Sequence, residues 1–131
     1  AWVIMSNHVH LIISSDNHRL EDIIRDMNKF TSRSLITAIK DNPQESRKNW
    51  MLWIFESAGK QNRNNKTCQF WQQDNHPVAL TTGLMKDQRV NYLHDNPVRA
   101  GLVGEHVDYL YSSAADYLHG SGWNVSILRL N

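Results

Sequence analysis

"AWVIMSNHVHLIIS", residues 1–14, carries apolar side chains at every second position from Val3 to Ile13, interrupted only by Asn7. Because side chains alternate between the two faces of a strand, this pattern predicts one β-strand over residues 2–14. The predicted core face carries Val3, Met5, Val9, Leu11 and Ile13. The opposite face carries Trp2, Ile4, Ser6, His8, His10 and Ile12. The sequence therefore predicts two imidazoles side by side on one face of a strand.

The two histidines form a candidate metal site, since ring nitrogens on the same strand face can meet one divalent ion. The chain has a single cysteine, Cys68, which excludes an internal disulfide and a thiolate-rich zinc or iron–sulfur site. Two imidazoles with oxygen donors favour Mg²⁺ or Mn²⁺, with positions left open for a phosphate. The alternative is a pair of hydrogen-bonded surface histidines, because seven histidines in one chain produce chance pairs.

Composition indicates one folded domain. The chain has 131 residues, with 40% hydrophobic and 21% charged residues, enough to build a core. The formal net charge of +1 says little about partners, so a nucleic-acid surface would need local clustering. No apolar run is long enough to cross a bilayer, and one cysteine fits a reducing compartment; we expect a cytoplasmic protein without a membrane partner. The chain opens without Met and already in strand pattern, which indicates that upstream residues are missing.

Hydrophobic periodicity and turn residues predict four further elements. They are a helix from Leu20 to Ile39 capped by Asp16 or Asn17 and ended by Asn42-Pro43, a helix over 44–60 closed by Gly59, a strand over 68–73, and a helix from Thr82 to Asp95 stopped by Pro97.

The predicted third helix and its end, RVNYLHDNPVRAG (89–101), carry the second candidate site. Tyr92 and Asn96 are four residues apart, so they lie on one helix face, and Arg89 is one turn before Tyr92. A phenol, an amide oxygen and a guanidinium there supply a nucleophile, a metal ligand and a phosphate clamp. A phenol has an ordinary pKa of about 10, so it needs a nearby metal and cation to attack. The alternative is an amphipathic helix whose tyrosine packs in the core.

Candidate DNA contacts are basic side chains, and one aromatic residue that could stack a base. They are Arg25, Lys29, Arg33, Lys86, Arg89, Arg99 and Trp71. For the cations the alternative is a solvated surface, and for Trp71 it is core packing. Tyr109, Tyr111 and Tyr117 could serve as nucleophiles in principle, but nothing in their local sequence selects one.

Four segments together resemble a known family. AWVIMSNHVHLII (1–13), FWQQDNHPVAL (70–80), VNYLHDNPVRAGLV (90–103) and DYLYSSAADY (108–117) occur in this order. They resemble the single-tyrosine HUH transposases, small insertion-sequence transposases, and most closely the REP-associated tyrosine transposases. The resemblance runs from Trp2 to about Gly120.

The resemblance implies roles for particular residues. His8 and His10 would bind the divalent metal, Asn96 would be the third ligand, and Tyr92 would be the nucleophile. The implied fold is α+β, with an antiparallel sheet of ferredoxin-like or RRM-like type and helices mainly on one face. The family's strand and helix before the histidine strand are missing. Residues 1–119 would form the catalytic domain of a homodimer, and residues 120–131 a mobile tail.

The implied reaction is metal-assisted transesterification of single-stranded DNA beside a hairpin. Tyr92 would attack a phosphodiester, leaving a 5′-phosphotyrosine and a free 3′-hydroxyl, and a later 3′-hydroxyl would reverse the step. Two alternatives stay open. One is an inactive or domesticated domain that only binds DNA hairpins. The other is a metal-dependent hydrolase that uses water, in which the tyrosine is structural.

Overall fold

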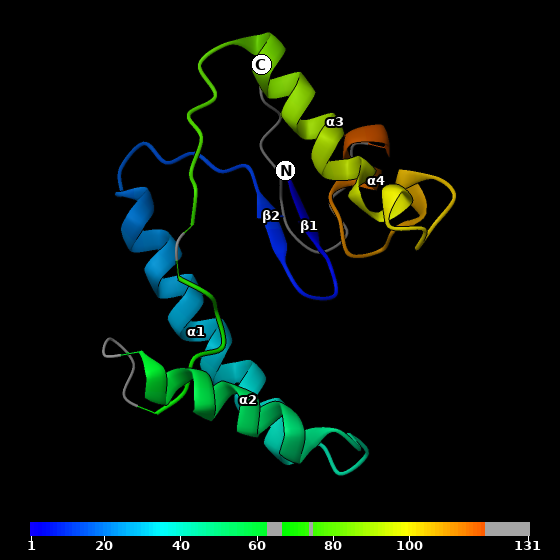
Figure 1. The fold of residues 1–131 in the computed structure, drawn as a ribbon. Helices are drawn as coiled ribbons and strands as arrows, with labels where there is room; N and C mark the ends of the chain where they lie inside the picture. Colours follow the sequence, from blue (N-terminus) through cyan, green and yellow to red (C-terminus); the bar gives the residue numbers. More distant parts are fainter. Residues whose placement is uncertain (63–66, 74, 120–131) are drawn as a thin grey trace. The chain divides into compact units, whose positions relative to one another are not determined.

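The computed structural model describes residues 1–62, 67–73 and 75–119 (Figure 1). Over these residues the fold is α+β, with a two-stranded antiparallel sheet and four α-helices. The chain divides into two compact units, which we describe separately. The first contains Ala1–Ser14 and the chain from Val78 onward, and the second contains Ser15–Pro77. The domain expected over 1–119 spans both units, and the tail expected over 120–131 lies outside the described residues.

The first unit begins with a β-hairpin. β1 (Trp2–Ile4) pairs antiparallel with β2 (Val9–Leu11), so the single strand predicted over 2–14 is wrong. The chain reverses at Ser6-Asn7, and the backbone N–H of Met5 donates to the carbonyl oxygen of His8 at 2.8 Å. A two-residue turn of this kind is the tightest connection that two antiparallel strands allow.

This turn changes which face the histidines occupy. Directly opposed residues of an antiparallel pair point to the same side, and Val3 stands opposite His10. Val3 is fully buried, and it packs with Met5 and Leu93 in a small apolar core. The imidazoles therefore lie on the core side of the hairpin, whereas the sequence pattern had placed them on the opposite face. A two-residue turn shifts the alternation by one position, which a continuous strand would not do.

Residues 111–113 cover the edge of β1 that does not face β2. The N–H of Ile4 donates to the carbonyl of Tyr111 at 2.8 Å, and that of Ser113 donates to Trp2 at 2.9 Å. An isolated bridge joins Val3 to Ser112 between these bonds. Both edges of β1 are thus hydrogen-bonded. The short helices η1 (His106–Asp108) and α4 (Ala114–His119) flank this segment.

The long helix α3 (Gly83–Arg99) packs against β1 (Figure 1). Thr82 caps its start, accepting a hydrogen bond from the N–H of Met85 at 3.2 Å. The sequence predicts that this helix ends at Asp95, but it continues through Pro97 and ends at Arg99. It ends in a Schellman arrangement around Gly101, whose φ of 69° favours glycine.

The second unit contains α1 (Leu20–Asp41) and α2 (Lys48–Gln61), which pack together. The expected side-chain cap from Asp16 or Asn17 is wrong, because the N-cap position is Arg19 and no side chain caps the helix. The second helix begins four residues later than expected, at Lys48 rather than at residue 44.

Gly59 does not close α2 but lies inside it, where it allows a close approach. A Cβ at Gly59 would lie 2.5 Å from the Cα of Cys68. The segment beginning at Cys68 crosses the helix there, and the N–H of Gln69 donates to the carbonyl of Phe55 at 2.8 Å. The strand expected over 68–73 does not form, because this segment packs on a helix rather than on a strand.

Candidate active site

The hairpin and α3 bring together the two histidines and one tyrosine. The rings of His8 and His10 are 4.9 Å apart between centroids and meet edge to face at 83°. The ring of His10 is 6.2 Å from that of Tyr92, again edge to face. His10 comes from β2 and Tyr92 from the middle of α3. The predicted nucleophile and one predicted metal ligand therefore neighbour each other in space, although 82 positions separate them in the sequence.

The immediate surroundings of His10 favour its neutral form. Partial burial lowers the pKa of His10, and the charge of His8 acts in the same direction. His8 is exposed, and its Nδ1 lies 2.6 Å from Oδ1 of Asn7. A histidine must be neutral at one ring nitrogen to bind a metal. The two imidazoles therefore fit a divalent ion as donors.

Asn96 occupies a different position from the one expected of a third ligand. Its side-chain Nδ2 donates to the carbonyl of Tyr92 at 2.9 Å and to that of Leu93 at 3.3 Å. The amide is thus folded back along its own helix. Within the described part of the chain no group of three His, Cys, Asp or Glu side chains could hold a metal. The structure brings His8 and His10 together, and it records no contact between Asn96 and either of them.

The cation beside Tyr92 is Arg99 rather than Arg89. The Cζ atom of Arg99 lies 5.3 Å from the centroid of the Tyr92 ring, a cation–π distance. Seven positions separate the two residues, which is two helical turns along one face. The sequence predicts Arg99 only as a DNA contact, because Pro97 predicts a helix that ends before it. With the helix extended to residue 99, the spacing alone would have found this pair.

Tyr92 has its ring beside the histidine pair. It is 44% exposed, so a polymer substrate can reach it. Tyr109 donates its hydroxyl to the carbonyl of Ile4 at 2.9 Å and anchors the sheet edge. Tyr111 is exposed and contacts Tyr109 edge to face, and Tyr117 packs edge to face on His94. Tyr109 and Tyr111 thus lie at the sheet edge, and Tyr117 lies against His94.

Two other DNA candidates of the first unit lie on α3. Arg89 is exposed, one turn before Tyr92. Lys86 precedes Tyr92 by six residues, which turns it about 120° away around the helix. It lines a separate hollow of ≈ 340 Å³ with Asp87, Val90, Asn91 and Tyr117. Arg89 and Arg99 thus share the face of Tyr92, and Lys86 does not.

The DNA candidates of the second unit differ in how far their charge is compensated. Arg25 is ion-paired with Asp22 and Asp26. Lys29 and Arg33 follow it at helical spacing, are exposed, and make no ion pair with any described residue. Trp71 donates its indole N–H to Thr31 on α1 at 2.8 Å and packs against Phe70. Trp71 therefore ties its segment to α1.

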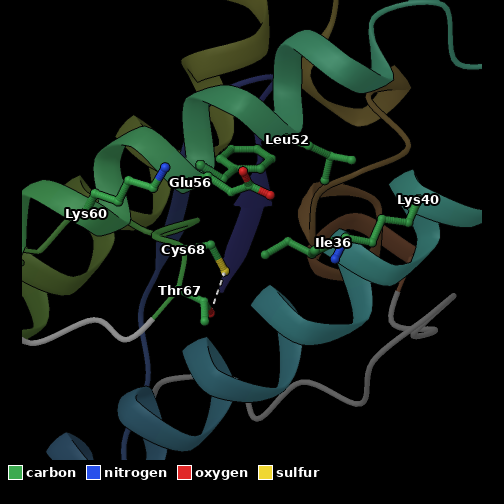
Figure 2. A pocket seen from close by; sticks show the side chains of 8 residues that line it. Ile36, Lys40, Leu52, Glu56, Lys60, Thr67 and Cys68 are labelled. Atoms are coloured by element: carbon green, nitrogen blue, oxygen red, sulfur yellow. Dashed lines mark hydrogen bonds between the residues drawn. The ribbon is translucent and has the colours of Figure 1, made fainter.

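A second hollow, of ≈ 380 Å³, lies between α1 and α2 in the same unit (Figure 2). Figure 2 shows Lys40 of α1 and Lys60 of α2 at its rim, with Glu56 and the thiol of Cys68 between them. The thiol accepts a weak hydrogen bond from the hydroxyl of Thr67 at 3.9 Å. No local sequence pattern predicts this hollow, because its residues come from three separate segments.

Comparisons of the chain with known protein families, with curated proteins and with solved structures return no match. Among the described residues no helix is both long and apolar enough to cross a bilayer.

Proposed function

We propose that the protein is a tyrosine transposase of the HUH type, which cuts and rejoins single-stranded DNA through a covalent protein–DNA intermediate. The observation that carries the proposal is the 6.2 Å approach of the His10 and Tyr92 rings across two elements. Two imidazoles, an accessible phenol and a guanidinium within one small region are the groups that phosphoryl transfer needs. The resemblance of four sequence segments to this family supports the same proposal.

In the proposed reaction the phenol oxygen of Tyr92 attacks a DNA phosphorus and loses its proton to solvent. The bond from phosphorus to the 3′ oxygen breaks, and that oxygen takes up a proton. The products are a 5′-phosphotyrosine and a free 3′-hydroxyl. Attack by another 3′-hydroxyl reverses the step and releases Tyr92. The bond energy is conserved in the phosphotyrosine, so joining needs no external energy source.

The other residues would hold the phosphate and the ring in place. The guanidinium of Arg99 lies over the Tyr92 ring, with Cζ 5.3 Å from its centroid, and would add positive charge near the phosphate. His8 and His10 would hold a Mg²⁺ or Mn²⁺ ion, with Asn96 as the further ligand suggested by the family pattern. When bound, the ion would polarise the phosphate and orient it for in-line attack.

The wider context of the site follows from the same proposal. The hairpin would be part of a larger antiparallel sheet of ferredoxin-like or RRM-like type. The active form would be a homodimer that binds a DNA hairpin with a single-stranded flank. Arg89 and Arg99 would contact the backbone near the cut, and the exposed Lys29 and Arg33 of α1 would be further backbone contacts.

The proposal is tested by incubating the protein and end-labelled single-stranded DNA with Mn²⁺ and separating the products on a denaturing gel. The wild type should form a labelled band at the mass of protein plus DNA, and Tyr92→Phe should form none, because the attacking oxygen is absent. Tyr111→Phe is the matched control, since Tyr111 is also exposed and its ring contacts Tyr109. An adduct that persists in Tyr92→Phe would assign the nucleophile to another residue.

A second candidate function is hairpin binding without cleavage. It is favoured by the folded-back amide of Asn96 and by the absence of a third His, Cys, Asp or Glu ligand among the described residues. The same gel separates the candidates. Hairpin binding in a mobility-shift experiment without adduct or cut strand would support the binding domain. Cut strand without adduct would support a hydrolase that uses water.

A further inference from the structure

We propose that Asn7 is a positioning residue, which fixes the ring nitrogen that His8 offers to a divalent metal. The inference rests on the proposed function, and it assigns to that site a residue that the sequence pattern did not single out. The observation is the 2.6 Å distance between Oδ1 of Asn7 and Nδ1 of His8. An amide oxygen can only accept a hydrogen bond, so this contact is a hydrogen bond when Nδ1 of His8 carries the proton.

This proton placement decides which atom remains for a ligand. A neutral imidazole has one N–H and one lone pair, so a proton on Nδ1 leaves the lone pair on Nε2. Histidines that bind metals usually donate their second ring N–H to a carbonyl, carboxylate or water, which fixes the ring and raises the basicity of the ligating nitrogen. Asn7 supplies that acceptor to His8 from the adjacent position.

The hairpin turn fixes the positions of Asn7 and His8 relative to each other. Asn7 is the second residue of the two-residue turn, and His8 follows it at the first position after the turn. The bond from the N–H of Met5 to the carbonyl of His8 closes the turn and fixes the backbone of both residues. The ring of His8 then lies edge to face against His10, on the side of the hairpin that faces α3. The turn therefore sets the direction of the His8 ring, and Asn7 sets its tautomer.

The test uses the full chain in two measurements. In the ¹⁵N-labelled protein without metal, long-range ¹H–¹⁵N spectra at a pH where His8 is neutral report which nitrogen is protonated. We expect Nδ1–H in the wild type and in Asn7→Asp, which keeps an acceptor oxygen. We expect a shift toward Nε2–H in Asn7→Ala. Ser6→Ala is the matched control for disturbance of the turn, and it should leave the tautomer unchanged.

The second measurement is calorimetric titration with Mn²⁺. Asn7→Ala should bind Mn²⁺ about 10-fold more weakly than the wild type, and Asn7→Asp should bind at least as tightly as the wild type. If the wild type binds no Mn²⁺, the metal site of the proposed function fails, and the proposal for Asn7 fails with it even where the tautomer is Nδ1–H. If Mn²⁺ binds but His8 carries its proton on Nε2, or Asn7→Ala changes neither tautomer nor affinity, only the role of Asn7 is overturned.

Discussion

The side-chain amide of Asn96 donates to the carbonyl oxygen of Leu93 at 3.3 Å, and this is the carbonyl that Pro97 leaves without a backbone donor. In a regular helix the N–H four residues later would fill that place, but proline has none. The Asn96 side chain therefore supplies the hydrogen-bond donor that Pro97 lacks, in the helical turn next to Tyr92. We predict that Asn96→Ala lowers the free energy of unfolding by about 1 kcal/mol, measured by urea denaturation.

A double-mutant cycle checks the cause of this loss. Pro97→Ala restores a backbone N–H at the same position, so that the carbonyl of Leu93 regains an ordinary donor. In the Pro97→Ala background the penalty of Asn96→Ala should shrink to about half or less, since neighbouring residues that share a partner are not additive. Equal penalties in both backgrounds would mean that the amide does not replace the missing bond.

A second prediction concerns Gly59, where α2 meets the segment that begins at Cys68. Gly59→Ala would place a methyl group 2.5 Å from the Cα of Cys68, so the backbone must move. We expect a loss of about 1–3 kcal/mol of unfolding free energy, the usual range for overpacking. The control is Gly83→Ala at the start of α3, where a Cβ meets nothing within 4 Å. A change of similar size at both positions would attribute the loss to something other than crowding.

The sequence predicted the elements whose signals are local. Apolar spacing and the Asn42-Pro43 stop placed the first helix within two residues of α1, and Thr82 marked the start of α3. The pattern failed at Ser6-Asn7, because the alternation of apolar residues continues on both sides of the turn and the turn lacks glycine. It failed again at Pro97, where a neighbouring side chain compensates for the missing N–H.

The site was predictable only in part, for a related reason. The spacing of His8 and His10 placed them on one face, and the spacing of Tyr92 and Asn96 did the same on the helix. The meeting of His10 with Tyr92 depends on how the hairpin packs against α3, which no local pattern encodes. Likewise, the contact of Arg99 with Tyr92 requires a helix that passes through proline.

The third prediction is a pH dependence of stability centred on His94. Burial lowers the pKa of His94 to about 4, and the charge of His106 acts in the same direction. His94 is only 5% exposed, and its Nε2 lies 2.9 Å from the hydroxyl of Ser113. The unfolded chain, with an ordinary histidine pKa of about 6.5, binds the proton first. Stability should therefore be full above pH 6.5 and fall as the pH drops toward 4.

The size of this effect is at most about 3 kcal/mol, the free energy that corresponds to the full difference between the two pKa values. Urea denaturation at several pH values between 7 and 4 measures it. His94→Gln removes the titrating group, so its stability should change less over this window than that of the wild type. His10 contributes in the same direction, since its pKa is also lowered, and a residual slope is expected. Parallel curves for the two proteins would exclude His94 as a source.

The fourth prediction separates the two roles that Arg99 could have in the proposed reaction. As a partner of the Tyr92 ring it should matter for the chemical step, whereas as a DNA contact alone it should matter for affinity. Loss of a positive charge from a phosphoryl-transfer site slows the step by about 100-fold. We therefore expect Arg99→Gln to slow adduct formation by about this factor at saturating DNA, and Arg99→Lys to be intermediate, because a lysine keeps the charge but not the planar stack.

Arg89→Gln is the control, because Arg89 is exposed on the same helix one turn before Tyr92. It should weaken DNA binding, measured by fluorescence anisotropy, with little change in the saturated rate. If Arg99→Gln behaves as Arg89→Gln does, Arg99 is a backbone contact and the stacking on Tyr92 has no part in the reaction.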